Sequence, residues 1–384
     1  MNELHAILDA WRDSASERQP GVLCTVVQVK GSAYRRPGAR MLIFPDGRRI
    51  GSISGGCLEG DVCRKGWWLT GDGRPALRVY DTMSEDDAVW EFGLGCNGVV
   101  HVLLERLESD NVQEAMRFLS RLRETNSEAV ISTVIRTVEN SVVQAGDRLY
   151  VTSGEMVSGP LAGSTIEDAL LRHSEEVFRE RKSRTVQVEK ASVLVEWVGP
   201  PVPLVVFGAG HDALPLAAMA KELGWNVTIA DGRPAYARAE RFPAADRVIL
   251  LAADDDLSGL QIDRESVVVL LTHNYPQDER LLREILPLRP RYLGILGPKK
   301  RAERLFEDLG EDLQQHRTVH APVGLDIGAD EPASIALSIL AEIQAALAGR
   351  MGGKLRGRSG PIHQREDDRS ENERAFRPMN VCAA

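Results

Sequence analysis

The sequence predicts an α/β protein in which a doubly wound parallel sheet forms the C-terminal half and an α+β domain precedes it. Strands and helices alternate after residue 203, which is the pattern of a parallel sheet with crossover helices. A glycine turn joins a buried strand to a helix within residues 204–223. A proline-rich stretch at 199–203 breaks the chain before this alternation, because proline is excluded from central strands. We therefore predict an N-terminal domain at 1–198 and a second domain at 199–348.

The N-terminal domain mixes helix and strand without βαβ alternation, so we predict the α+β class for it. Amphipathic or charged segments predict helices, and runs rich in β-branched residues predict strands. The predicted helices are 3–13, 58–69, 111–124 and 164–182. The predicted strands are 24–29, 40–44, 48–53, 76–80, 99–105, 129–136, 141–145 and 147–151, with one or two more within 184–197. The sequence suggests no internal repeat.

The C-terminal domain follows strict strand–helix alternation. The predicted strands are 204–207, 226–230, 247–251, 266–271, 291–296 and 317–320, and the predicted helices are 212–223, 278–286, 299–309 and 332–348. From Gly349 onward the chain is rich in glycine, arginine and acidic residues and has few apolar ones. Such a composition cannot bury enough surface to fold, so we predict a disordered tail at 349–384.

Composition excludes several classes of function. The formal net charge is −9 and no dense basic stripe occurs, which argues against nucleic acid and anionic membranes as partners. No apolar run reaches the roughly 20 residues of a membrane span. The first five residues lack the features of a signal peptide, so we expect a cytoplasmic protein. The five cysteines form no C-x-x-C pair, which argues against a disulfide framework and a cysteine-only zinc site.

The glycine turn of the C-terminal domain has the G-x-G-x-x-A pattern of a Rossmann nucleotide site. A buried strand at 204–207 leads into Gly208, and the second glycine is Gly210. The first glycine permits the turn, the second allows a pyrophosphate to approach, and Ala213 allows close helix–strand packing. Asp231 ends the second strand, where an acid commonly accepts ribose hydroxyls. The turn therefore predicts a nucleotide-like ligand, although a glycine turn in a ligand-free domain is the alternative.

Further loops should meet at the same edge, because ligands in such sheets bind beyond the carboxyl ends of the strands. His273 is either a proton-transfer group or a structural residue at a strand end. Lys299 is either an anion contact or a solvated helix cap. Asp212 at the helix start would repel a phosphate unless it points away, and Arg233 could neutralise that region. The candidate cofactor-binding residues of this domain are Gly208, Gly210, His211, Asp231, Arg233, Thr272, His273, Gly297, Lys299, Gly324, Asp326 and Gly328.

Two glycine-rich loops of the N-terminal domain carry cysteines. Gly55 and Gly56 precede Cys57 at the start of a predicted helix, where a thiol tends toward the thiolate. Cys96 lies in a similar glycine context. Thiolates of this kind suit a soft metal centre or sulfur transfer, so all four residues are candidate cofactor contacts and Cys57 is a candidate metal ligand. The alternative is that both cysteines are small packing residues.

Seven motifs along the chain resemble those of the XdhC/CoxI family, the accessory proteins of xanthine dehydrogenase and CO dehydrogenase. They run in family order through nearly the whole chain, with looser agreement at about 105–195 and in the tail. The motifs are GSAYRRPGARM (31–41), GSISGGCLEGDV (51–62), GLGCNG (93–98), VFGAGH (206–211), LTHN (271–274), YLGILG (292–297) and APVGLDIGA (321–329).

The resemblance implies a non-catalytic chaperone for the molybdenum cofactor, a molybdopterin. Such a protein would protect the cofactor during sulfuration and help to insert it into a molybdenum hydroxylase. The implied partners are the apo-hydroxylase and a cysteine desulfurase, and we expect a homo-oligomer. Two alternatives remain: an oxidoreductase that binds NAD(P) or another nucleotide at the Rossmann turn, and a ligand-free scaffold.

Overall fold

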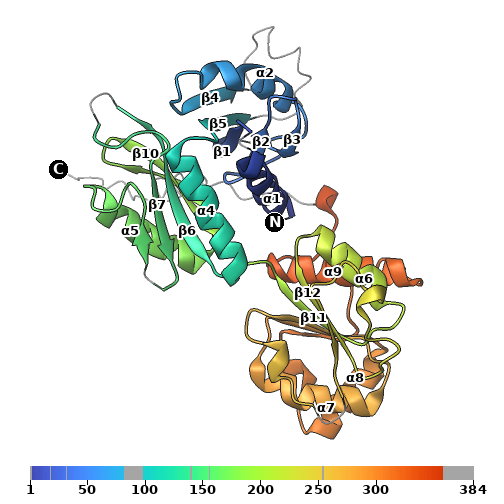
Figure 1. The fold of residues 1–384 in the computed structure, drawn as a ribbon. Coiled ribbons are helices and arrows are strands. Elements are labelled where there is room, and N and C mark those ends of the chain that lie inside the picture. Colours follow the sequence, from blue (N-terminus) through green and yellow to red (C-terminus); the bar gives the residue numbers. More distant parts are fainter. Residues whose placement is uncertain are drawn as a thin grey trace, which may run out of the picture. The chain divides into compact units, whose positions relative to one another are not determined.

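The computed structural model describes residues 2–17, 19–31, 33–81, 98–138, 141–154, 156–252 and 255–357. The chain forms two compact units, Glu3–Pro200 and Pro201–Arg358. Figure 1 labels their helices and strands. Among the described residues, no helix is long and apolar enough to cross a membrane.

The first part of the N-terminal unit is a helix followed by a five-stranded antiparallel sheet of order β3-β2-β1-β5-β4. Strand β1 pairs with both β2 and β5. Strands β2 and β3, predicted at 40–44 and 48–53, pair in antiparallel fashion. The elements are α1 (Asn2–Glu17), β1 (Val22–Gly31), β2 (Arg40–Ile43), β3 (Arg49–Gly51), α2 (Glu59–Leu69), β4 (Ala76–Asp81) and β5 (Gly98–Arg106).

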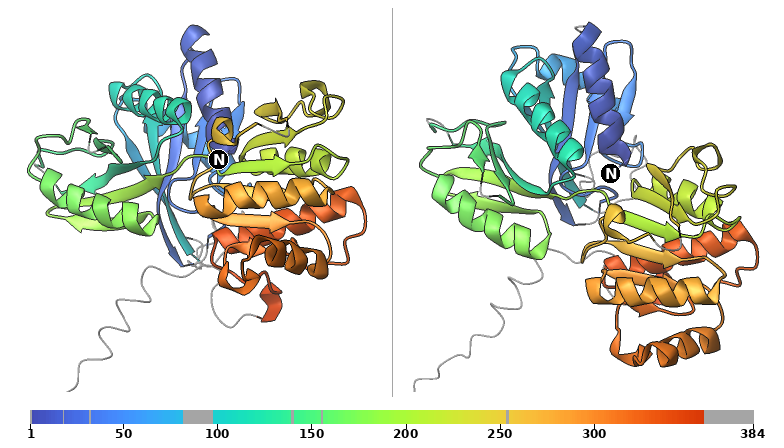
Figure 2. Two further views of the ribbon diagram at one scale, coloured as in Figure 1. Left: turned by 90° about the horizontal axis from the view of Figure 1, so that it is seen from below. Right: turned by 60° about the horizontal axis from the view of Figure 1, so that its bottom comes forward.

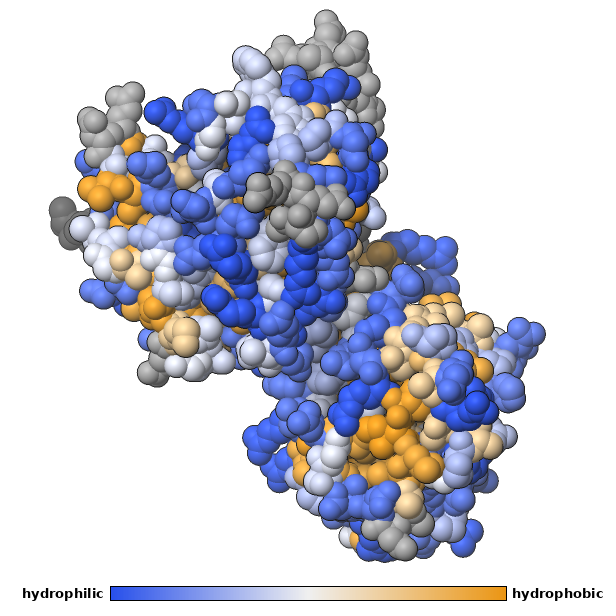
Figure 3. All heavy atoms as spheres, viewed as in Figure 1, coloured by the Kyte–Doolittle hydropathy of each residue, from blue (hydrophilic) through white to orange (hydrophobic). Residues whose placement is uncertain are grey.

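The second part of this unit is again a helix followed by a five-stranded antiparallel sheet, of order β8-β7-β6-β10-β9. Helix α5 packs on this sheet, and α1 lies beside α4 (Figures 1 and 2). The outward face around α1 and α4 is mostly hydrophilic (Figure 3). The elements are α4 (Asp110–Thr125), β6 (Ala129–Thr137), β7 (Arg148–Thr152), β8 (Val157–Ser158), α5 (Glu167–Glu180), β9 (Arg184–Val188) and β10 (Ala191–Val198).

These two parts are repeats of one structural module, so the expectation of no internal repeat is wrong. The element order is the same in both parts. Strands β2 and β4 and helix α2 begin 108 positions before their counterparts β7, β9 and α5. Arg12 and Ser120, which are hydrogen-bonded across the repeats, are separated by the same number of positions. The strand orders also correspond. Even the bulges match, because the pairing skips Val27 in β1 and Ile135 in β6. We call Asn2–Arg106 the first repeat and Asp110–Val198 the second.

The predicted strand at 141–145 is wrong. These residues form bends and turns between β6 and β7, and the Asp147 carboxylate accepts a hydrogen bond from the backbone N–H of Gln144 at 2.7 Å. Val143 is buried without a strand partner. Packing on a turn therefore explains Val143, whereas Val142 is exposed.

The C-terminal unit contains a six-stranded parallel sheet of order β13-β12-β11-β14-β15-β16, which confirms the predicted doubly wound fold. Helix α7 begins earlier than predicted because the Asn274 side chain caps it and Pro276 suits its first turn. The elements are β11 (Pro203–Phe207), α6 (Ala213–Glu222), β12 (Asn226–Asp231), β13 (Arg247–Leu250), β14 (Val267–Leu270), α7 (Tyr275–Ile285), β15 (Tyr292–Ile295), α8 (Lys299–Leu309), β16 (Val319–His320) and α9 (Pro332–Leu347).

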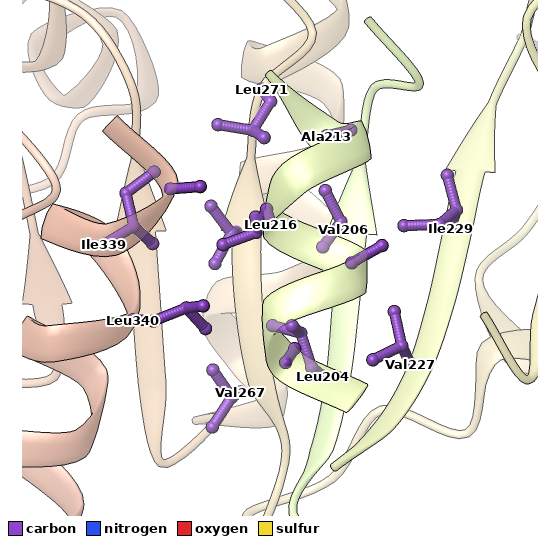
Figure 4. Close-up of a cluster of buried hydrophobic side chains, with 14 of the residues drawn as sticks. Leu204, Val206, Ala213, Leu216, Val227, Ile229, Val267, Leu271, Ile339 and Leu340 are labelled. Carbon is purple, nitrogen blue, oxygen red and sulfur yellow. The ribbon is translucent and has the colours of Figure 1, made fainter. Parts of the chain in front are cut away.

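Both faces of the parallel sheet are covered by helices (Figure 1). Leu204 and Val206 point to one face, where they pack with α6 and α9 (Figure 4). Val205 and Phe207 point to the other face, where they pack with α7 and α8. The central strands β11 and β14 are therefore apolar at every position, as expected for strands buried on both sides. Of the tail predicted from Gly349, the structure describes residues up to 357, and the rest lies outside the described residues.

Candidate functional site

The order in which successive strands are added to the parallel sheet reverses between β11 and β14. Folds of this class bind ligands at the carboxyl ends of the strands beside this point. Gly208 follows β11 with a φ of +105°, and an added Cβ would lie 2.4 Å from the carbonyl oxygen of Leu271. Only glycine fits there, because both the backbone angle and the approach of β14 exclude a side chain. Gly208 is therefore required by the fold itself.

Gly210 differs from Gly208 in its surroundings. A Cβ at Gly210 would meet no atom within 4 Å, and the residue has an ordinary backbone angle. The neighbouring His211 is exposed, and helix α6 begins at Ala213. The free N–H groups at a helix start attract anions, so the open space above Gly210 suits a phosphate.

The Asp231 carboxylate fixes the glycine turn from β12. It accepts hydrogen bonds from the Ala209 N–H at 2.6 Å and from the Arg233 backbone N–H at 2.8 Å. The Arg233 side chain adds Nε at 2.9 Å and Nη2 at 2.7 Å. Burial opposes ionisation of Asp231, but these hydrogen bonds outweigh it and hold its pKa below the ordinary value. Both carboxylate oxygens are thus engaged within the protein.

Arg233, predicted to neutralise the region of the helix start, forms its ion pair with Asp231. The Asp212 carboxylate lies 3.2 Å from Nε2 of His273. His273 follows β14, is exposed and has a φ of +55°. This contact brings together the loops after β11 and β14, and a protonated His273 would offset the Asp212 charge beside the helix start.

The loop after β14 is anchored through Asp278 and Arg301, which the sequence did not single out. Thr272 donates a hydrogen bond to the buried Asp278 of α7, which forms an ion pair of 2.7 Å with Arg301 of α8. A Cβ on Gly297 would lie 3.3 Å from the Arg301 side chain. Lys299, in contrast, is exposed and lies 3.7 Å from Glu303, which favours the solvated helix cap.

The loop after β16 is held by Glu342 of α9, which sequence reasoning also missed. Its carboxylate accepts the Gly324 N–H at 2.8 Å and the Tyr292 hydroxyl at 2.5 Å, and it lies 3.4 Å from Nδ1 of His320. Burial opposes ionisation of Glu342, but His320, Tyr292 and Gly324 lower its pKa overall. Asp326 and Gly328 further along this loop are exposed.

The second candidate site is the glycine-rich loop before α2 in the N-terminal unit. Glu59 is buried, and its carboxylate accepts hydrogen bonds from the Ser54 N–H at 2.8 Å, the Ile53 N–H at 3.2 Å and the Ser54 hydroxyl. The Ser54 oxygen in turn accepts the Cys57 thiol at 3.5 Å. Burial opposes ionisation of Glu59, but the Ser54 hydrogen bonds lower its pKa. Glu59 therefore holds the loop and is a poor base.

Cys57 is half-buried, and the preceding Gly55 and Gly56 are exposed. Cys96 lies outside the described residues. Among the residues that the structure describes, no group of three or more His, Cys, Asp or Glu side chains is arranged to hold a metal ion. The metal role predicted for Cys57 thus stays a prediction.

The buried carboxylates that anchor the glycine and β16 loops, Asp231 and Glu342, are engaged by internal donors, and Asp278 is engaged in the same way. Such an edge can bind a ligand through backbone N–H groups but offers these acids no free role in proton transfer. The C-terminal unit thus belongs to the Rossmann class of ligand-binding domains.

Comparison with known proteins gives the family. The XdhC Rossmann domain model matches residues 204–343, and the XdhC and CoxI family model matches residues 14–81 and 122–189. This chain belongs to the XdhC and CoxI family. The two stretches of the second match are 108 positions apart, in agreement with the structural repeat.

Three relatives illustrate the likeness. The chain is 34% identical to a probable xanthine dehydrogenase subunit of Bacillus subtilis (strain 168), over 79% of this chain and 87% of that protein. It is 27% identical to the molybdenum cofactor insertion chaperone PaoD of Escherichia coli (strain K12), over 72% of this chain and 66% of that one. A crystal structure described as a xanthine dehydrogenase from Bacillus halodurans is 29% identical, with a TM-score of 0.73 over 92% of this chain and 98% of that one.

Proposed function

We propose that this chain is a molybdenum cofactor-binding chaperone. It protects the cofactor during sulfuration and aids its insertion into a molybdenum hydroxylase of the xanthine dehydrogenase or CO dehydrogenase type. Membership of the XdhC and CoxI family and the likeness to an insertion chaperone support a role in maturation.

The proposal rests on a contrast at the carboxyl edge of the parallel sheet. Backbone N–H groups at the start of α6 can bind a ligand, whereas the neighbouring carboxylate is already engaged within the protein. Gly210 leaves open space at the start of α6, where backbone N–H groups attract a phosphate. The Asp231 carboxylate beside it is fully used by Ala209 and Arg233. These features suit binding and release of a phosphorylated pterin rather than chemistry on it. The residues whose backbone N–H groups would hold the phosphate are Gly210 and His211, because the Gly208 N–H already binds the Ala230 carbonyl at 2.8 Å.

The thiol loop is a separate proposed cofactor contact within the N-terminal unit, suited to a soft metal. Thiolate is a soft ligand that suits molybdenum, and Cys57 is accessible beside two exposed glycines. Ser54 and Glu59 fix the loop without supplying a base. When bound, the cofactor brings the metal and sulfur chemistry, and this chain orients it and shields it from water.

The proposed partners are an apo-hydroxylase and a cysteine desulfurase, and we propose that the protein acts in the cytoplasm as a homo-oligomer. The net charge of −9 argues against nucleic acid and anionic membranes as partners.

The rival function is an NAD(P)-dependent oxidoreductase, which the glycine turn alone would favour. A nicotinamide dinucleotide normally places a ribose hydroxyl on the acid that ends the second strand. Here that acid is Asp231, and a hydroxyl would have to displace the Arg233 side chain. This competition makes the rival less favourable.

The experiment is purification of the full chain from a host that makes molybdenum cofactor. We expect molybdenum and pterin to copurify, and Cys57→Ala to reduce the molybdenum content while the protein stays folded. Cys63→Ala is the matched control, because Cys63 is a half-buried thiol on α2, outside the glycine loop. Equal retention by wild type and Cys57→Ala would remove that cysteine as a ligand. Reduction of NAD with a small substrate, without bound cofactor, would favour the rival.

A further inference from the structure

The two repeats of the N-terminal unit carry corresponding loops before α2 and α5. Gly55 and Glu59 of the first loop correspond to Gly163 and Glu167 of the second, 108 positions later. Glu167 also accepts a hydrogen bond from its own loop, from the Gly163 N–H at 2.5 Å. The second loop is therefore the positional counterpart of the thiol loop, although its glutamate is bonded by a different position of the loop.

The copy lacks the chemistry of the original. Thr165 stands where the first repeat has Cys57, and Ala162 stands where it has Ser54. The thiol and the hydroxyl that holds it are thus both missing. The strand connections differ as well, since residues 82–97 join β4 to β5 whereas only Glu189 and Lys190 join β9 to β10.

Two buried ion pairs join the repeats. In each, an arginine of one repeat binds a glutamate of the other. Arg40 of the first repeat binds Glu196 of the second, with Nη1 at 2.8 Å and Nη2 at 2.5 Å from the carboxylate. Arg148 of the second repeat binds Glu105 of the first, at 3.0 Å and 2.5 Å. The two pairs are related by the repeat, and each fixes one module to the other through a bidentate contact.

The glycines around these pairs correspond too. Gly38 accepts a hydrogen bond from Arg40 at 2.8 Å, and Gly146 accepts one from Arg148 at 2.9 Å. A Cβ on Gly38 would lie 2.6 Å from Glu196, and one on Gly146 would lie 2.9 Å from Glu105. The close packing shows that the carboxylates have little room to move.

Arg40 links its ion pair to the thiol loop. The Arg40 carbonyl accepts the N–H of Ser52, the first residue after β3, at 3.1 Å. In the second repeat the Arg148 carbonyl accepts the Leu161 N–H at 3.1 Å, because Pro160 stands in the place of Ser52 and has no N–H to donate. Each arginine therefore ties a loop of its own repeat to an acid of the other.

We infer that the N-terminal unit keeps one thiol site, in the first repeat, and that Glu196 of the second repeat is its positioning residue, acting through Arg40. The second repeat has lost the site and serves as its support. Neutralising Glu196 leaves the Arg40 guanidinium buried without its counter-charge, which loosens the strand end from which the thiol loop starts. The role of the thiol rests on the proposed function, but the positioning by Glu196 does not.

The test is the rate at which iodoacetamide alkylates Cys57 in the full chain, followed by peptide mass spectrometry. Cys63 serves as the internal reference for general loosening of the first repeat. Glu196→Gln should raise the alkylation rate of Cys57 relative to that of Cys63 by about fivefold, which corresponds to about 1 kcal/mol of loop stability. Glu105→Gln is the matched control, since it breaks the equivalent ion pair, whose arginine ties the other loop. It should leave the Cys57-to-Cys63 ratio unchanged.

Equal effects of the two variants, or no effect of either, would overturn the inference. If either glutamine variant fails to fold, Arg40→Lys and Arg148→Lys make the same comparison, because lysine keeps the charge and loses the bidentate geometry. The readout needs no bound cofactor. A change in Cys57 alkylation without molybdenum retention would therefore refute the proposed function and leave the positioning role standing.

Discussion

Asp231 at the end of β12 accepts a hydrogen bond of 2.6 Å from the backbone N–H of Ala209, in the glycine turn after β11. One carboxylate thus sets the conformation of the turn that forms the candidate phosphate site. The same carboxylate holds the Arg233 side chain. The acid expected to contact a ligand is therefore first of all a structural part of the loop.

Replacement of Asp231 by alanine should loosen the glycine turn. The Ala209 N–H loses its acceptor and Arg233 loses its counter-charge, which should cost about 1–3 kcal/mol of local stability. Hydrogen exchange of peptides spanning 204–231 measures this directly, because a two-unit chain has no single free energy of unfolding. Glu307→Ala on the exposed side of α8 is the control and should leave exchange unchanged. Unaltered protection in Asp231→Ala would contradict the structural role.

Gly208 and Gly210 should respond differently to alanine. Gly208→Ala forces a side chain onto the Leu271 carbonyl at a positive φ and should cost at least about 1–3 kcal/mol. Gly210→Ala meets no atom and should leave stability within about 0.5 kcal/mol. Its Cβ nevertheless occupies the space proposed for a phosphate, so cofactor retention should fall. Hydrogen exchange of peptides spanning 204–223 and molybdenum analysis of both variants make the comparison. Full retention by Gly210→Ala, and by the larger Gly210→Val, would argue against ligand binding there.

Glu342 should make the loop after β16 sensitive to acid. Its pKa is lowered in the folded state, so its stabilising contribution is present above its ordinary pKa of about 4.3 and is lost as the pH falls through the lower folded value. Hydrogen exchange of residues 319–330, measured from pH 6 downward with correction for intrinsic rates, should show this loss in the wild type. Glu342→Gln should already be less protected at pH 6 and change little on acidification. Parallel pH curves would contradict the assignment.

Glu59 and Glu167 offer a comparison between the two repeats. Glu59 is buried and accepts several loop hydrogen bonds, whereas Glu167 accepts one on an exposed loop. Glu59→Gln should therefore destabilise the unit by about 1–3 kcal/mol, and Glu167→Gln should stay within about 0.5 kcal/mol. Hydrogen exchange of peptides that span the two loops, residues 51–69 and 159–180, provides the measurement. A larger loss in Glu167→Gln would reverse the ranking of the loops.

The sequence predicted the C-terminal unit well because its signals are local. Apolar strands, a glycine turn and alternating helices leave few ways to build the sheet, and Gly208 and Asp231 take the positions expected of them. The anchoring residues Asp278, Arg301 and Glu342 escaped notice because they act from helices. Their partners lie on loops distant in the sequence, and no local pattern marks such contacts.

The repeat escaped notice for a related reason. The modules share fold, spacing and a few residues such as Arg40 and Arg148, while most side chains differ. Ion pairs between Arg40 and Glu196 or Arg148 and Glu105 join positions far apart, so they emerge only in the folded chain. Comparing the chain with itself at the matched spacing would have revealed the shared glycines and arginines.

The most direct test of the central claim is the molybdenum and pterin content of the full chain purified from a cofactor-producing host. Elemental analysis and pterin fluorescence after oxidation should detect both components together in the wild type, and both should decrease in Gly210→Val. Protein that carries neither molybdenum nor pterin, in a host where a molybdenum hydroxylase becomes fully loaded, would contradict the cofactor chaperone account.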